Sequence, residues 1–123
     1  RPLFDAPGLA VEDPCVFVID GHYEMIAKDL NGKTAGELHA GIHLLSRDGV
    51  AWDFAPEPKA YSRQVRWSDG QVRTLANLER PFVLVQDGVP TWMFAAMGEG
   101  ATGGPGVFGA LQRTWNGVIP LGA

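Results

Sequence analysis

The residues that could do chemistry are carboxylates at equivalent positions of an internal repeat. Glu12 and Asp13 are adjacent at the start of one predicted strand, and Glu79 starts another in the same way. Hydrolysis of a glycosidic bond uses two carboxyl groups, roughly 5–5.5 Å apart for retention and roughly 6.5–9.5 Å apart for inversion. Because neighbouring strand residues point to opposite faces, we expect only one of Glu12 and Asp13 to line a shared site. Glu12, Asp13 and Glu79 are the candidate catalytic residues.

Arg80 stands where the first copy has Asp13, and two roles are open to it. Its guanidinium has the bidentate geometry that binds sugar hydroxyls or a carboxylate, which would make it a substrate-binding residue. It could equally pair with Asp13 across the repeat and neutralise a buried charge, and we favour this ion pair. The glutamates have a structural alternative too, since each could bind backbone N–H groups or pair with Arg80 where the copies meet.

Three further side chains are candidates for binding a substrate. Asp29 ends a predicted strand and could open onto the same site, although a solvated acid in a turn is the alternative. His22, expected near Glu12, could bind a ligand or simply hydrogen-bond to the protein. Trp67 precedes a predicted turn and is expected to be exposed, where its ring could stack on a sugar, whereas Trp92 is expected in the core.

No metal site and no cofactor are predicted. His39 and His43 are four residues apart, a spacing that suits a helix and not the strand expected there, and no third ligand is near. The single cysteine, Cys15, excludes an internal disulfide framework and a cysteine-based zinc site. It is expected to be an inert thiol in an apolar strand.

The internal repeat predicts the elements that position these residues. Residues 11–21 and 78–88 share the pattern apolar-Glu-charged-Pro-x-Val-apolar-Val-x-Asp-Gly. In each copy the proline marks a strand entrance, the apolar run predicts a strand, and Asp-Gly predicts a tight hairpin turn. Return strands are expected over 22–29 and 91–97. Self-similarity of this kind is typical of repeated supersecondary units.

The remaining segments predict more antiparallel strands and no helix. We expect strands over 39–46, 50–54 and 115–121, a break over 55–59, a hairpin formed by 64–67 and 71–75, and a flexible loop over 98–109. The predicted fold is all-β and antiparallel, with two sheets that resemble β-propeller blades. Residues 1–123 form one domain, with blade-like repeats over about 11–58 and 77–123 joined by a linking hairpin over 59–76.

Length and composition exclude several classes of protein. The 123 residues, 46% of them hydrophobic, allow one small globular domain. A net charge of −4 argues against nucleic acid as a partner. No apolar run is long enough for a membrane helix, so no membrane partner is predicted. Residues 1–5 do not have the character of a signal peptide, and no compartment is predicted.

Four motifs together resemble the five-bladed propeller glycoside hydrolases of the family 43 and family 117 type. They are Val11-Glu12-Asp13-Pro14 with the following Gly21-His22-Tyr23-x-Met25-x-x-Lys28-Asp29, then Ser46-Arg47-Asp48-Gly49-Val50-Ala51-Trp52, Leu78-Glu79-Arg80-Pro81, and Trp115-Asn116-Gly117-Val118-Ile119-Pro120-Leu121. They span nearly the whole chain. The resemblance implies a propeller fold, with Glu12 or Asp13 facing its axis, and a relation to carbohydrate chemistry.

The resemblance covers about two blades, so it implies the C-terminal portion of such an enzyme, and the segment that usually supplies the general base would lie upstream. We therefore expect a glycoside-hydrolase-like fragment that is inactive alone. The alternatives are a noncatalytic carbohydrate-binding module and a stand-alone structural protein. Carbohydrate is the expected ligand. Self-association is also expected, because two isolated blades leave sheet faces and edges uncovered.

Overall fold

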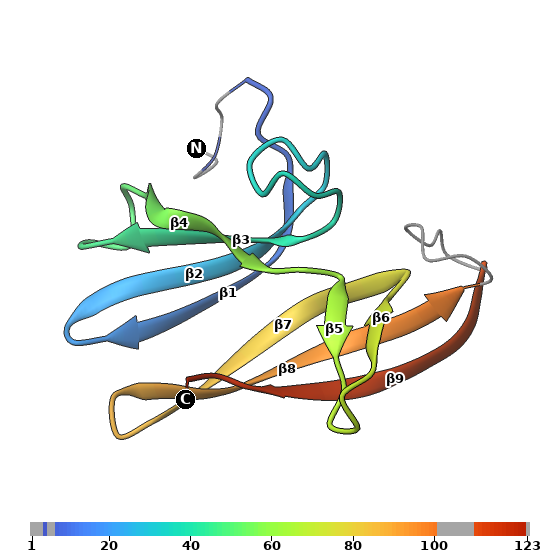
Figure 1. Cartoon of the computed structure of the whole chain (residues 1–123). Helices are drawn as coiled ribbons and strands as arrows, with labels where there is room; N and C mark the ends of the chain where they lie inside the picture. Colours follow the sequence, from blue (N-terminus) through green and yellow to red (C-terminus); the bar gives the residue numbers. More distant parts are fainter. Residues whose placement is uncertain (1–3, 5–6, 101–109, 123) are drawn as a thin grey trace.

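The computed structural model describes residues 4, 7–100 and 110–122, which contain strands and loops only (Figure 1). The strands of this part are β1 (Val11–Ile19), β2 (His22–Asp29), β3 (Gly41–Ser46), β4 (Asp53–Tyr61), β5 (Gln64–Arg66), β6 (Val72–Thr74), β7 (Asn77–Gln86), β8 (Val89–Gly100) and β9 (Leu111–Pro120). The predicted all-β class is confirmed. In the described residues no helix of the length and apolarity needed to cross a membrane is found.

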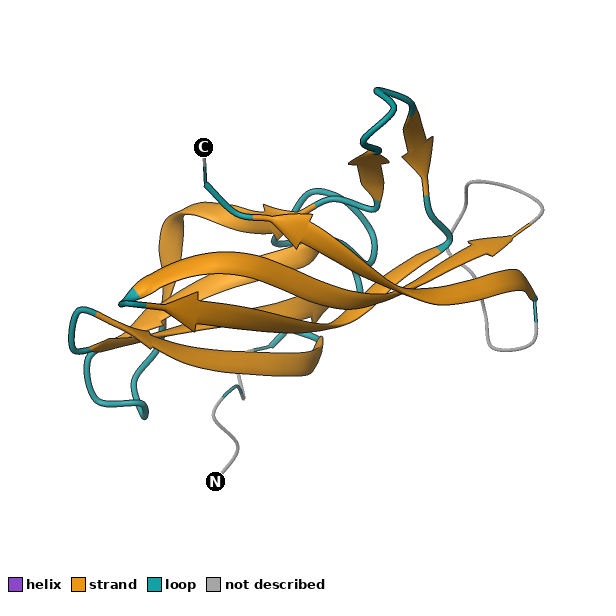
Figure 2. Cartoon of the chain, turned by 90° about the horizontal axis from the view of Figure 1, so that it is seen from below, coloured by secondary structure: helices purple, strands orange, loops and turns teal. Residues whose placement is uncertain are grey.

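The strands form three antiparallel sheets. The first sheet has the order β1-β2-β3-β4, the second sheet has the order β7-β8-β9, and a small β5-β6 hairpin connects them in the sequence. Figures 1 and 2 show this hairpin standing out from the two larger sheets. β1 and β2 of the first sheet contact β7 of the second. Each larger sheet therefore starts with one copy of the repeat, and the two copies meet.

The two copies follow the same backbone path. Both Asp-Gly turns have positive φ at both residues, 47° and 77° in the first copy and 51° and 76° in the second, as a tight hairpin turn requires. Both first strands also have a bulge at the same repeat position, centred on Asp13 (φ 55°) and Arg80 (φ 52°). The predicted equivalence of the two hairpins is confirmed down to this bulge. The second copy adds one further irregularity, between Leu84 and Val85.

Strand β4 corrects the prediction that residues 55–59 break the sheet. It runs from Asp53 to Tyr61 through both Pro56 and Pro58. An edge strand tolerates proline, since one of its sides needs no backbone donor, and the pairing of β4 with β3 is irregular at two places. Most of the predicted loop over 98–109 lies outside the described residues, and its first three residues belong to β8.

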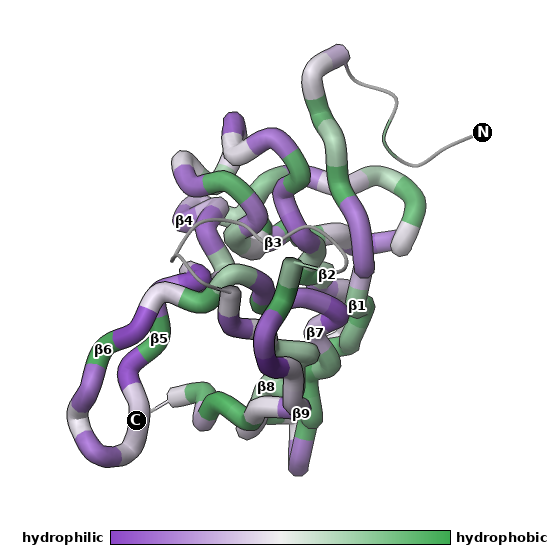
Figure 3. The backbone as a smooth tube through the Cα atoms, turned by 90° about the vertical axis from the view of Figure 1, so that its right-hand side faces the viewer, coloured by the Kyte–Doolittle hydropathy of each residue, from purple (hydrophilic) through white to green (hydrophobic). Residues whose placement is uncertain are grey.

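Buried side chains form two hydrophobic clusters, one on each face of the first sheet. The larger lies between the sheets and joins Ile26 of β2 with Leu78, Val83 and Met93 of the second sheet. The smaller covers the opposite face of the first sheet and contains Met25, Ala27, Ile42 and Leu44. Figure 3 shows hydrophobic and hydrophilic segments alternating along the chain, with the turn of the β5-β6 hairpin hydrophilic. Val65 and Trp67 pack the hairpin against the larger cluster, and the turn residues 68–70 are exposed.

Candidate functional site

The repeat-equivalent glutamates converge on one lysine. Lys28 Nζ lies 2.8 Å from a carboxylate oxygen of Glu12 and 2.7 Å from one of Glu79. The bulge in β1 causes this arrangement, because it shifts the register so that Glu12 lies opposite Lys28. Asp13 Oδ2 is 3.9 Å from the same nitrogen. Of the two adjacent carboxylates, Glu12 lines the cavity beside this lysine and Asp13 does not, in line with the expectation that only one of them would line a site.

The charges of this cluster stabilise each other. Burial acts to lower the pKa of Lys28, but hydrogen bonds to Glu12 and Glu79 outweigh it and raise that pKa above its ordinary value of 10.5. Burial acts to raise the pKa of Glu79, yet the hydrogen bond from Lys28 and its positive charge bring that pKa below 4.5. Lys28 and Glu79 are consequently both ionised at neutral pH.

A polar cavity of about 720 Å³ opens beside this cluster. Its walls include Glu12, Lys28 and Glu79, and also His39, Asn77 and Arg80. The Asn77 amide donates a 3.3 Å hydrogen bond to Glu79. The cavity thus brings together three of the predicted site residues, Glu12, Glu79 and Arg80, with Asp13 adjacent through Lys28.

Arg80 does not form the predicted ion pair with Asp13. Its backbone N–H, not its guanidinium, donates to Asp13 Oδ2 at 3.2 Å, and the Arg80 side chain is exposed. The reason is the bulge, which turns the peptide N–H of one copy toward the carboxylate of the other. Two strands from different sheets are linked by this bond between equivalent bulges.

The Asp29 side chain does not line the cavity and instead binds the loop that follows β2. Its side chain is 1% exposed, and its carboxylate accepts hydrogen bonds from four backbone N–H groups of the following loop. The donors are Asn31 at 3.3 Å, Gly32 at 3.0 Å, Thr34 at 3.0 Å and Ala35 at 2.9 Å. A carboxylate with this many partners is already satisfied, so the predicted role of Asp29 in substrate binding is wrong.

His22 lies far from Glu12, contrary to the prediction. It pairs with Ile19 next to the turn, whereas Glu12 lies at the other end of the same hairpin. His22 Nε2 is 3.0 Å from one oxygen of Glu24, and His43 Nε2 is 2.7 Å from the other. Even so, the described residues contain no group of three or more His, Cys, Asp or Glu side chains arranged to hold a metal ion.

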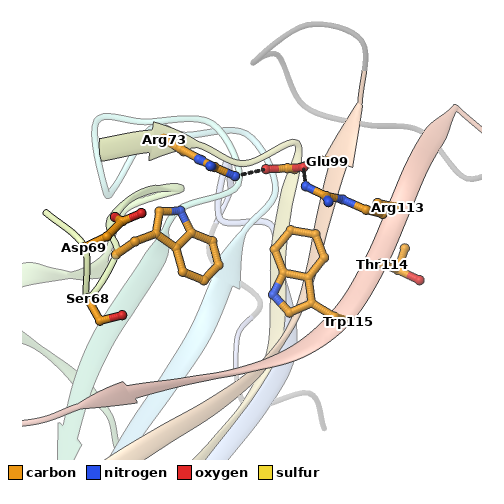
Figure 4. Close-up of a pocket in the computed structure, with 8 residues that line it drawn as sticks. Ser68, Asp69, Arg73, Glu99, Arg113, Thr114 and Trp115 are labelled. Carbon is orange, nitrogen blue, oxygen red and sulfur yellow. Dashed lines mark hydrogen bonds and ion pairs between the residues drawn. The ribbon is translucent and has the colours of Figure 1, made fainter. Parts of the chain in front are cut away.

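A second cavity, of about 430 Å³, is built around two tryptophans (Figure 4). Trp67 comes from the β5-β6 hairpin and Trp115 from β9, and their ring centroids are 6.0 Å apart. The guanidinium of Arg73 lies 5.9 Å from the Trp67 centroid, and that of Arg113 lies 5.6 Å from the Trp115 centroid. Both are distances at which a cation is attracted to an aromatic ring.

Glu99 contacts both arginines, which lie beside the two rings. It lies 3.5 Å from Arg73 and forms an ion pair with Arg113, as Figure 4 shows. The hydrogen bond from Arg113 lowers the pKa of Glu99 below 4.5. The result is a cavity with an aromatic side and an ordered charged rim. Thr114 and Trp115 line this cavity and also the polar one, so the two adjoin.

The expected exposures of Trp67 and Trp92 are reversed. Trp67 is half-buried against the core, and Trp92 is 40% exposed. Trp92 occupies the same face of β8 as Phe94, and this face points away from the other sheet, whereas Met93 between them is buried. Sequence analysis also missed Lys28, Arg73, Glu99 and Arg113 as parts of a site. None of the four had a local signal, because Lys28 comes to lie opposite Glu12 only through the bulge in β1.

No protein-family model and no curated protein matches the sequence.

Proposed function

We propose that this chain is a carbohydrate-binding unit related to the propeller glycoside hydrolases, and that it is not a glycosidase by itself. The observation that carries the proposal is the cavity lined by Trp67 and Trp115. An aromatic ring stacks on the apolar face of a sugar, while ionised side chains fixed around it hydrogen-bond to the hydroxyls. The cavity offers both kinds of contact, and it adjoins the polar cavity of the glutamates, so there is room for more than one sugar unit.

The arrangement of the sheets supports the propeller part of the proposal. Each large sheet is an antiparallel meander, and each begins with the same bulged strand. The first strands of the two sheets contact each other. Adjacent propeller blades are likewise repeated meanders arranged around a common axis. In this view the polar cavity lies at the axial end of the two blades.

Hydrolysis is disfavoured by the position of Lys28. A glycosidase needs one carboxylic acid with a raised pKa and a second carboxylate across the scissile bond. Here the space between Glu12 and Glu79 holds the lysine ammonium, where a glycosidic oxygen would have to lie. Glu79 has a lowered pKa, which is the opposite of what a general acid requires. The same cluster is well suited to hold the two sheets together.

Isothermal titration calorimetry with a panel of neutral and uronic-acid-containing oligosaccharides tests the binding proposal. We expect at least one class to bind, and Arg113→Ala to weaken that binding several-fold. Arg66→Ala is the matched control, because Arg66 is also an exposed strand arginine and does not line the cavity. Absence of binding across the panel, or equal losses in both variants, would reject the site.

A parallel screen against aryl glycosides tests the absence of hydrolysis. The wild-type chain should show no turnover above the uncatalysed rate. Turnover that both Asp13→Asn and Glu79→Gln abolish would contradict this part of the proposal, since it would mean that the carboxylates act despite Lys28.

A further inference from the structure

Two apolar sheet faces point to solvent on opposite sides of the molecule. On the first sheet, the Val16 face consists of Val16, Val18 and Tyr23, which are 50%, 53% and 37% exposed. On the second sheet, the Phe82 face consists of Phe82, Trp92, Phe94 and Val118, which are 59%, 40%, 42% and 53% exposed. Phe82, Phe94 and Val118 are paired across three strands, so they form one row. Exposed apolar patches on sheets are typical of interaction surfaces.

The internal repeat shows what such faces pack against. Inside the chain, Cys15 and Phe17 of the first copy pack into the same core as Val83 and Val85 of the second. Cys15 Sγ also accepts a 3.4 Å hydrogen bond from the backbone N–H of Val83. One face of copy one is thus complementary to the opposite face of copy two.

The two exposed faces contain the repeat-equivalents of the residues that form this internal contact. The residues of the second copy that correspond to Cys15 and Phe17 are Phe82 and Leu84, on the Phe82 face. The residues of the first copy that correspond to Val83 and Val85 are Val16 and Val18, on the Val16 face. The two exposed faces therefore correspond to the two faces that already pack against each other inside the chain.

We propose that the Phe82 face of one chain docks on the Val16 face of a second copy, repeating the internal contact between the two sheets. The association is head-to-tail, so each added chain presents a free face to the next one, and the chains can form a closed ring. It rests on the repeat and on the packing of the sheets, and it does not depend on carbohydrate binding.

Sedimentation velocity of wild-type and variant chains tests the proposal. The wild type should associate at high micromolar concentration. Val18→Glu and Phe94→Glu each place a charge on one exposed face, and each variant alone should sediment as a monomer. Val72→Glu changes an exposed valine of the β5-β6 hairpin, away from both faces, and should associate like the wild type. Circular dichroism and thermal unfolding check that all three variants stay folded.

Mixing the variants separates head-to-tail from symmetric association. Val18→Glu retains the Phe82 face and Phe94→Glu retains the Val16 face, so an equimolar mixture should form a one-to-one dimer. A wild-type chain that stays monomeric would overturn the proposal, because the faces would then be covered by some other partner or by further segments of a longer chain. Association that either variant retains alone, or a mixture that stays monomeric, would also overturn it.

Discussion

At the scale of single residues, the chain places one ammonium group between two glutamates that the repeat makes equivalent. Lys28 is 7% exposed and Glu79 is 19% exposed, so this pair is shielded from solvent more than a surface ion pair, whereas Glu12 is 52% exposed. Exposed pairs contribute little to stability, whereas removing one partner of a shielded pair leaves a charge that nothing compensates. Lys28 is therefore the residue on which the carboxylate cluster depends.

Lys28→Met tests that dependence. Without the ammonium group, Glu12, Asp13 and Glu79 face one another as uncompensated charges, and we expect a loss of about 3 kcal/mol in the free energy of unfolding at neutral pH. The loss should become smaller in mild acid, because a protonated carboxyl group no longer needs the lysine. Urea denaturation at both pH values measures it. A variant as stable as the wild type at neutral pH would show that the cluster is dispensable.

The pKa directions predict how stability depends on pH. Glu79 and Glu37 both have pKa values below 4.5 in the folded chain, despite burial, because of hydrogen bonds from Lys28 and Lys59 respectively. Their contribution is present above pH 4.5 and is lost as the pH falls through the lower folded values. Lys28 has a raised pKa, so its contribution is present below pH 10.5 and is lost as the pH rises through the higher folded value.

Denaturation midpoints measured across the pH range check this dependence. Stability should begin to fall below pH 6.5, because burial lowers the pKa of His39, should fall further as the carboxylates are protonated, and should fall again at high pH. Glu79→Gln should be less stable than the wild type at neutral pH and should lose less on acidification. A wild type that becomes more stable as the pH falls below 4.5 would contradict the assignment.

The sequence alone predicted the carboxylates of this cluster but not the lysine that they contact. Counting back from the Asp20-Gly21 turn, a regular hairpin would place Glu12 opposite Asp29. The bulge shifts the partner by one residue, to Lys28. A residue before proline normally adopts an extended conformation, so the left-handed φ of Asp13 could not be expected. For Asp29, its place at the end of a strand does not indicate that the backbone N–H groups of the following loop enclose its carboxylate.

At the scale of elements, the strands that end in Asp-Gly turns were predictable and β4 was not. The turn residues fix the ends of β1, β2, β7 and β8, because few residues other than Gly, Asn and Asp accept positive φ. For β4, two prolines indicate a break, and only its position at the sheet edge lets it continue. Edge position is a property of the assembled sheet and has no local signal.

Two glycines of the strands should respond differently to alanine. A Cβ at Gly41 would lie 2.2 Å from the ring of Tyr61, whereas a Cβ at Gly117 would lie 2.2 Å from the sulfur of Met97. The buried ring of Tyr61 is rigid and Met97 is flexible, so we expect Gly41→Ala to cost about 2–3 kcal/mol and Gly117→Ala about 1 kcal/mol or less. Chemical denaturation measures both. Equal costs would mean that β3 and β4 can separate easily.

At the scale of the whole molecule, the two copies of the repeat share their turn and their bulge, whereas the β5-β6 hairpin has no counterpart in the repeat. This hairpin brings Trp67 to Trp115, although the two are distant in the sequence. The repeat predicted two equivalent hairpins, but it could not predict where a segment without a counterpart in the repeat would pack. For that reason the tryptophan cavity was recognisable only in the structure.

The four indole N–H signals of the chain test the central claim most directly. In ¹⁵N–¹H spectra, each of Trp52, Trp67, Trp92 and Trp115 gives one side-chain signal, assignable by substitution. On titration with a binding oligosaccharide, the signals of Trp67 and Trp115 should move together and saturate at one concentration. Trp52, whose indole N–H already donates to Gly49 O at 3.2 Å, and Trp92, on the Phe82 face, should stay in place. Unchanged signals for Trp67 and Trp115, or movement confined to Trp92, would contradict the proposed carbohydrate site.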